Sequence, residues 1–151
     1  MLFFLPRPEV AIAEFQRVLK PKGRVVIALH ERTLMSNYPE DTSLQPPIEH
    51  VIPEIADVLL PRKLPLMLQA HGFTDISVNA EMDRIYTKIG HFQPEHRNNL
   101  TEILSSGMHR LADTLGGQEA AETFLSDWLA YLDRVDTSSY TMLWVVQASA
   151  P

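Results

Sequence analysis

The feature that most constrains the fold is the segment Arg24–Leu29, RVVIAL, where one arginine is followed by apolar residues without polar alternation. Its short length and its β-branched residues favour a strand over a helix. Strands without alternation typically lie in sheets that helices cover on both sides. We therefore expect a strand at 24–29 that is buried on both faces.

A helix and a tight turn precede this strand. Apolar residues recur at helical spacing over 8–20, PEVAIAEFQRVLK, and Pro8 suits a first helical turn because its missing N–H has no partner there. Pro21 disfavours helical geometry at the residue before it, and Gly23 permits a tight turn. The sequence thus predicts a helix, a turn and a buried strand in succession.

Further helices and strands follow. Pro65 can open a short helix for which Gly72 is the C′ residue, with Phe73 folding back onto it. A strand is expected at 75–80, two helices at 94–135 that separate at Gly116-Gly117, and a final strand at 139–150. This alternation indicates an α/β protein.

Composition excludes several classes of function. The net charge is −6, which disfavours a nucleic-acid partner, and the absence of cysteine excludes disulfides and thiolate chemistry. No run approaches the ~20 apolar residues of a membrane span, so we expect no membrane partner and a cytoplasmic location. The six histidines form no HxxxH or HExxH pattern, and we predict no metal site.

Three segments resemble class I S-adenosylmethionine-dependent methyltransferases of the small-molecule type. They are LPRPEVAIAEFQRVLKPKGRVVIAL, LMLQAHGFTDISV and SYTMLWVVQASAP, in that order. The family commonly has an RVLKPGG-like turn before a buried strand, and here Lys22 replaces the first glycine of that turn. The resemblance covers nearly the whole chain, but it maps the chain onto the C-terminal half of the family only.

The resemblance implies a partial Rossmann-like fold. Leu2, Phe3 and Phe4 would be the tail of the family's fourth strand, and 24–29 would be the fifth strand, with the last (seventh) strand beside it and then the sixth. Residues 1–151 would form a single half-domain, and 94–135 would be a helical substrate lid inserted into it.

The family's methyl-donor site is mostly missing from this chain. No GxG occurs among the six glycines, so the glycine-rich loop that follows the family's first strand is absent. We expect S-adenosylmethionine to bind only if a homodimer or another chain carrying the N-terminal half completes the site. An open apolar strand edge favours such association.

Candidate site residues follow from the same resemblance. Leu2, Phe3 and Phe4 would lie near the donor. His30, Glu31 and Arg32 come directly after the buried strand, where α/β enzymes often bind ligands. His30 would be a general base for the methylated nucleophile. Phe124 and Trp128 would line the lid and contact a small apolar acceptor.

Each of these residues also has a purely structural interpretation, as loop start or core aromatic. Two alternatives to a methyltransferase half therefore stay open. The chain could be a non-catalytic, dimerising or ligand-binding protein derived from a methyltransferase. It could also be a truncated fragment that begins at an internal methionine. In a complete enzyme, catalysis would come mainly from proximity and orientation.

Overall fold

The computed structural model describes residues 2–31, 36–40, 44, 56–84 and 87–151. The chain divides into two compact units. The first unit comprises residues 1–32, 56–82 and 142–151, and the second comprises 33–55 and 83–141. The predicted lid at 94–135 falls within the second unit.

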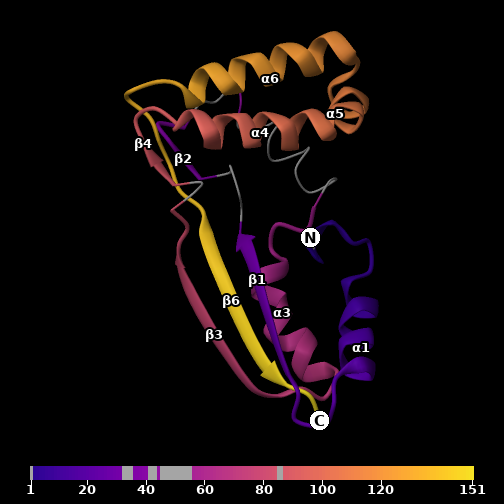
Figure 1. Cartoon of the computed structure of the whole chain (residues 1–151). Helices are drawn as coiled ribbons and strands as arrows, with labels where there is room; N and C mark the ends of the chain where they lie inside the picture. The colour runs from indigo at the N-terminus through magenta and orange to yellow at the C-terminus, as the bar shows by residue number, and fades with distance from the viewer. Residues whose placement is uncertain (1, 32–35, 41–43, 45–55, 85–86) are drawn as a thin grey trace. The chain divides into compact units, whose positions relative to one another are not determined.

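The first unit contains a three-stranded sheet in the order β1-β6-β3, visible in Figure 1. Its strands are β1 (Arg24–Glu31), β6 (Met142–Ser149) and β3 (Thr74–Met82). The last strand of the chain, β6, lies between the two earlier ones and runs antiparallel to both. Strands β1 and β3 are consequently parallel to each other without being neighbours.

Helices cover one face of this sheet. They are α1 (Pro8–Val18) and α3 (Leu60–Ala70), which lie on the same side of β1 in Figure 1. Every third or fourth residue of α3 is apolar and points to the sheet, which is the pattern of an amphipathic helix. The buried core consists of Leu2, Ile12, Leu29, Leu60, Leu64, Leu68, Phe73, Val146, Ala148 and Ala150.

The prediction that β1 is buried on both faces is wrong for the described structure. Exposure alternates along the strand, and Val26 is 60% exposed while Leu29 is buried. Side chains of a strand alternate between its faces, and α1 and α3 both pack on one of them. Within the described part of this unit, no element covers the face that carries Val26.

Two further predictions in this unit need correction. Leu2–Phe4 form a 3-10 helix, η1, and not the end of a strand. Helix α3 begins at Leu60 with Pro61 in its first turn, so Pro65 lies inside the helix and does not open it. Prolines are favoured in the first turn of a helix. This helix contains both Pro61 and Pro65, and the sequence pattern alone does not show which of them marks its start.

The ends of the predicted helices are otherwise confirmed. The Phe73 N–H donates to the Leu68 carbonyl at 3.1 Å, and Phe73 is buried against the helix as expected. Gly72 has a φ of +78°, the left-handed conformation of a C′ residue. The turn before β1 forms as predicted, with the Gly23 N–H on the Lys20 carbonyl at 2.7 Å.

The second unit is mainly helical. It contains α4 (Pro94–Ser106), α5 (Met108–Leu115) and α6 (Gln118–Leu132). The sequence predicts two helices over this range, whereas the first is divided at Gly107. The stop at Gly116-Gly117 is confirmed, since their φ values are +88° and +144°. On α6 the buried residues are Ala121, Phe124, Trp128, Tyr131 and Leu132.

A small sheet in the second unit has no counterpart in the predictions. Its strands are β2 (Asn37–Tyr38), β5 (Ser138–Ser139) and β4 (Lys88–Ile89), in the order β2-β5-β4. Two-residue strands are too short to show a period of two in the sequence.

Among the described helices of the whole chain, none has the length and apolar character needed to cross a membrane.

Candidate functional site

The carboxyl end of β1 carries two of the predicted site residues, and it directs them to opposite faces of the sheet. Glu31 belongs to the face that α1 and α3 cover, and only 4% of it is exposed. His30 is half-buried on the other face, opposite Leu143 of β6. A ligand would therefore meet the imidazole and the carboxylate from different sides. Arg32 lies outside the described residues.

Glu31 is held by an arginine that sequence reasoning missed. The Nε and Nη2 atoms of Arg62 lie 2.7 and 2.6 Å from Glu31 Oε1. This carboxylate raises the pKa of the Arg62 guanidinium, first through the hydrogen bond and then through its charge. The pair links the end of β1 to the first turn of α3. Sequence reasoning misses it because it predicts a helix that starts at Pro65, three residues after Arg62.

The predicted donor contacts lie mainly against the core. Leu2 is buried in the core cluster and Phe3 packs on it, whereas about half of the Phe4 surface is exposed. The two phenyl rings are 4.4 Å apart, and the Phe3 carbonyl accepts a hydrogen bond from the Asp57 N–H at 2.9 Å. Of the three residues, Phe4 has the most side chain available to a ligand.

The described residues do not form a complete site for S-adenosylmethionine. Adenosyl groups are usually bound where a glycine-rich loop joins a strand to a helix and lets the backbone approach the ligand. Here Gly23 and Gly72 serve turns, and Gly107, Gly116 and Gly117 separate helices. Gly90 follows β4, but it stands alone. We therefore derive no donor-dependent step from this chain by itself.

The aromatic pair predicted for the lid lies on α6. The rings of Phe124 and Trp128 are 5.9 Å apart, as the four-residue spacing on a helix requires. Trp128 is fully buried and belongs to the core of the unit. Phe124 is also largely buried, but it lines a cavity of about 680 Å³ that is wide open to solvent. The pair is therefore divided between core and cavity.

This cavity extends along one face of α6. It begins at the turn between α5 and α6 and continues for about two turns. Its walls are formed by Leu44, Leu115, Gly116, Gly117, Gln118, Glu119, Ala120, Thr123, Phe124 and Asp127. Its volume lies within the ~300–1,000 Å³ of typical small-molecule sites. Of the residues in its walls, Phe124 is the one that the sequence analysis expects to contact a ligand.

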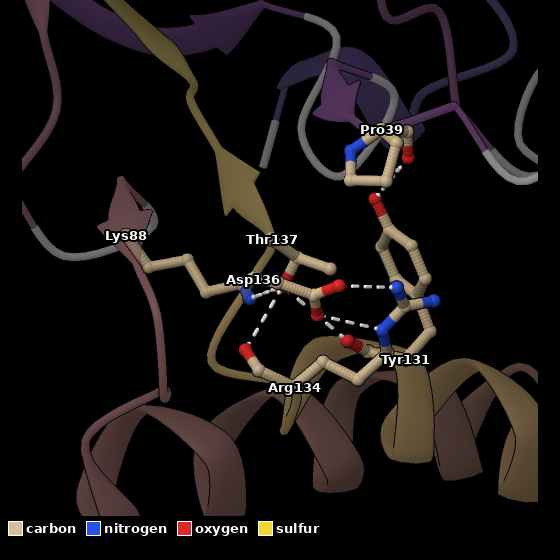
Figure 2. Close-up of polar contacts among 6 residues, drawn as sticks. All are labelled: Pro39, Lys88, Tyr131, Arg134, Asp136 and Thr137. Carbon is tan, nitrogen blue, oxygen red and sulfur yellow. Dashed lines mark hydrogen bonds and ion pairs between the residues drawn. The ribbon is translucent and has the colours of Figure 1, made fainter.

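A buried polar cluster lies at the C-terminal end of α6, as Figure 2 shows. Lys88 is only 6% exposed, and its ammonium donates to the Gly90 carbonyl at 2.9 Å and to the Thr137 hydroxyl. The Thr137 hydroxyl in turn donates to the Arg134 carbonyl at 3.1 Å. Nearby, the Tyr131 hydroxyl donates to the Pro39 carbonyl at 2.7 Å.

Burial lowers the pKa of Lys88, and the negative charges of Asp133 and Asp136 partly oppose this effect. A lysine with a lowered pKa can be a nucleophile or base. Here, however, two of its three donor positions are used by protein acceptors, and the ring of Phe92 lies 5.8 Å from the nitrogen. This arrangement indicates a structural role, in which Lys88 links β4 to the chain that follows α6.

Comparison with known proteins gives distant structural likenesses. No family model matches the chain, and no curated protein matches it. A solved structure of phosphoethanolamine N-methyltransferase 2 from Haemonchus contortus, with phosphomonomethylethanolamine and S-adenosylhomocysteine, is 17% identical with a TM-score of 0.46. It is matched over 99% of this chain and 32% of its own.

Two further structures are similar at the same level. The [4+2]-cyclase SpnF is 19% identical with a TM-score of 0.49, over 100% of this chain and 48% of its own. The same Haemonchus enzyme with S-adenosyl-L-methionine is 18% identical with a TM-score of 0.41, over 95% and 30%. The chain thus spans less than half the length of each of these structures.

Proposed function

We propose that this chain is the substrate-side half of an S-adenosylmethionine-dependent methyltransferase that acts on a small molecule. The observation that carries the proposal is the placement of β6 between β1 and β3, antiparallel to both. This is the order that the sequence resemblance implies for the family's fifth, seventh and sixth strands. It supports the assignment because a chain folding as a simple meander would place neighbouring strands in sequence order.

This proposal requires a donor-binding half that the described residues do not provide. It would be supplied by a partner chain, by a second copy, or by further residues of a longer chain. The residues of this chain would position the acceptor. His30, at the carboxyl end of β1, would accept the proton of the methylated nucleophile. The Glu31–Arg62 pair would keep this end of the strand in place.

Among the described strands, β1 pairs only with β6, and its other edge is the proposed attachment point for that half. The Ala150 N–H donates to the Gly23 carbonyl at 2.8 Å, so Gly23 directs its carbonyl toward the β6 side. Polar groups of an antiparallel strand alternate in direction. Val26 and Ala28 therefore direct their N–H and C=O groups away from β6, where an added strand would bind them.

Two linked measurements test the proposal. The first reads the coding sequence directly upstream of Met1, where an in-frame strand followed by a glycine-rich loop and a helix is expected. The second titrates S-adenosylmethionine by calorimetry into the chain joined to that upstream segment, or into the isolated chain after light scattering has established its mass. Saturable micromolar binding supports the proposal.

Ala28→Pro provides the matched perturbation of the edge. It removes an N–H that points away from β6, so the sheet of the isolated chain should persist while strand addition is blocked. Ala28→Val retains the N–H and is the control. An absent upstream glycine-rich loop, together with a folded dimer that binds no donor, would refute the proposal.

A second candidate function is a ligand-binding protein that does not catalyse methyl transfer. The cavity along α6 favours it, because the described residues that form this cavity belong to the second unit alone. Binding of a small molecule there, by a chain that never binds S-adenosylmethionine, is the result expected for this alternative.

A further inference from the structure

We propose that the cavity along α6 binds an organic cation, an amine with an apolar body. This inference does not depend on the proposed function, because it concerns the second unit alone. The cavity has two kinds of wall. Leu44, Leu115 and Phe124 provide apolar surface, whereas Glu119 and Asp127 provide two carboxylates. No lysine, arginine or histidine is among its described lining residues.

The spacing along α6 explains how both carboxylates reach one cavity. Glu119, Thr123 and Asp127 are four residues apart, so they share one face of the helix. At 1.5 Å per residue, the eight residues from Glu119 to Asp127 correspond to about 12 Å of helix. The side chain of Phe124 lies beside Thr123 in this interval. An elongated apolar ligand would therefore meet an acidic group near either end.

The charge of the cavity favours a cation over an anion. The N-terminus of α6 also faces this cavity, and its dipole is equivalent to about half a positive charge. Two carboxylates outweigh that half charge and leave a net of about −1.5. Helix α6 carries no basic residue that would neutralise these two carboxylates. An anionic ligand would approach against this field.

The two carboxylates are free to bind a ligand. In the described part of the chain, neither Glu119 nor Asp127 forms an ion pair or a side-chain hydrogen bond. Glu122, on the same helix, instead accepts a hydrogen bond from the Gln118 amide at 2.8 Å and does not line the cavity. Glu122 is therefore a natural control position with the same charge.

The test uses three probes of equal chain length and different charge. Octylammonium, octanol and octanoate are titrated separately, below their micellar concentrations, by calorimetry and by NMR. Octylammonium should bind at least about tenfold more tightly than octanoate, since two carboxylates attract the one and repel the other. Its affinity should also fall as salt is raised, because these carboxylates are exposed.

Variants locate the site. Glu119→Gln and Asp127→Asn should each weaken octylammonium binding by about threefold to tenfold, the range of exposed charge pairs. Glu122→Gln should leave the affinity unchanged. Ala120→Trp, which places a large side chain in the cavity, should abolish binding of all three probes. The chain has two tryptophans, and the indole N–H signal of Trp128 should shift on binding while that of Trp144, in the first unit, should not.

Four results would overturn the inference. Equal affinity for the three probes would show a merely apolar cavity. Tighter binding of octanoate would show that the helix N-terminus dominates the field. Absence of saturable octylammonium binding to a folded chain, or an equal effect of Glu122→Gln, would show that the cavity is not an amine site.

Discussion

Replacing Thr137 by valine should destabilise the second unit by about 2 kcal/mol at pH 7. The side chain is only 2% exposed, and its hydroxyl accepts a hydrogen bond from the Lys88 ammonium while donating to the Arg134 carbonyl. A hydrogen bond to a charged group contributes about 1.5–3 kcal/mol when its loss leaves that group buried. Valine retains the shape of threonine, so a small gain from its extra apolar surface reduces the net loss.

Thr137→Ser is the matched control. It retains the hydroxyl and removes one methyl group, which should cost only about 0.8 kcal/mol. The difference between the two variants therefore measures the hydroxyl contacts rather than packing.

The pH dependence distinguishes the role of Lys88 from a general packing defect. Burial places the folded-state pKa of Lys88 below its unfolded value of 10.5. The unfolded chain thus holds the proton more tightly, and the free energy of unfolding rises as the pH rises from the folded to the unfolded pKa. Loss of an acceptor in Thr137→Val lowers the folded pKa further. The deficit of this variant relative to wild type should consequently shrink as the pH approaches 10.5.

The assay is urea denaturation followed by tryptophan fluorescence in a Trp144→Phe background. Trp128 then reports on the second unit alone, because it is buried in the core around α6. A serine variant as unstable as the valine variant, or a valine deficit that stays constant between pH 7 and 10.5, would refute the reasoning about the ammonium.

Three further predictions concern the first unit, and each is measured by denaturation in a Trp128→Phe background. Leu64→Ala should cost about 2–5 kcal/mol because Leu64 is fully buried, whereas Leu66→Ala, 69% exposed on the same helix, should stay within about 0.5 kcal/mol; similar losses would contradict the assigned core. Lys22→Gly should stabilise by about 0.5 kcal/mol, because Lys22 has a φ of +60° where the family-like turn has glycine; a loss would show that the turn adopts another geometry. Arg62→Met should lower the melting temperature of the chain that retains Glu31. The same substitution should have a smaller effect in the Glu31→Gln variant, which lacks the buried charge. Additive effects of the two substitutions would mean that the pair is not coupled.

The sequence by itself determined the elements whose signals are local. The helix predicted within 8–20, the turn at Lys20–Gly23 and the stop at Gly72 depend on residues within a few positions of each other. All of them form, although the helix ends at Val18. The same is true of the stop at Gly116-Gly117. Prolines, glycines and apolar spacing act through backbone sterics and helix geometry, which require no knowledge of distant segments.

Some residues that sequence reasoning proposed for a site also lie at the places described above. This reasoning identified His30 and Glu31 at the end of β1 and Phe124 at the later cavity. It could not find Arg62 or Lys88, because their partners lie far away in the sequence, at Glu31 and Thr137. Such contacts leave no periodic pattern, and the residues involved have the composition of an ordinary exposed surface.

Only the tertiary structure decided which surfaces are covered. The apolar segment at 24–29 is compatible with two buried faces, but burial depends on what packs against the strand. Helices α1 and α3 both pack on one side, so Val26 stays exposed while Leu29 is buried. For the same reason, the regular spacing of apolar residues on α6 could not distinguish Phe124, which borders a cavity, from Trp128, which lies in the core. The sequence specifies a helix face, whereas the neighbouring segments determine whether that face meets protein or an open cavity.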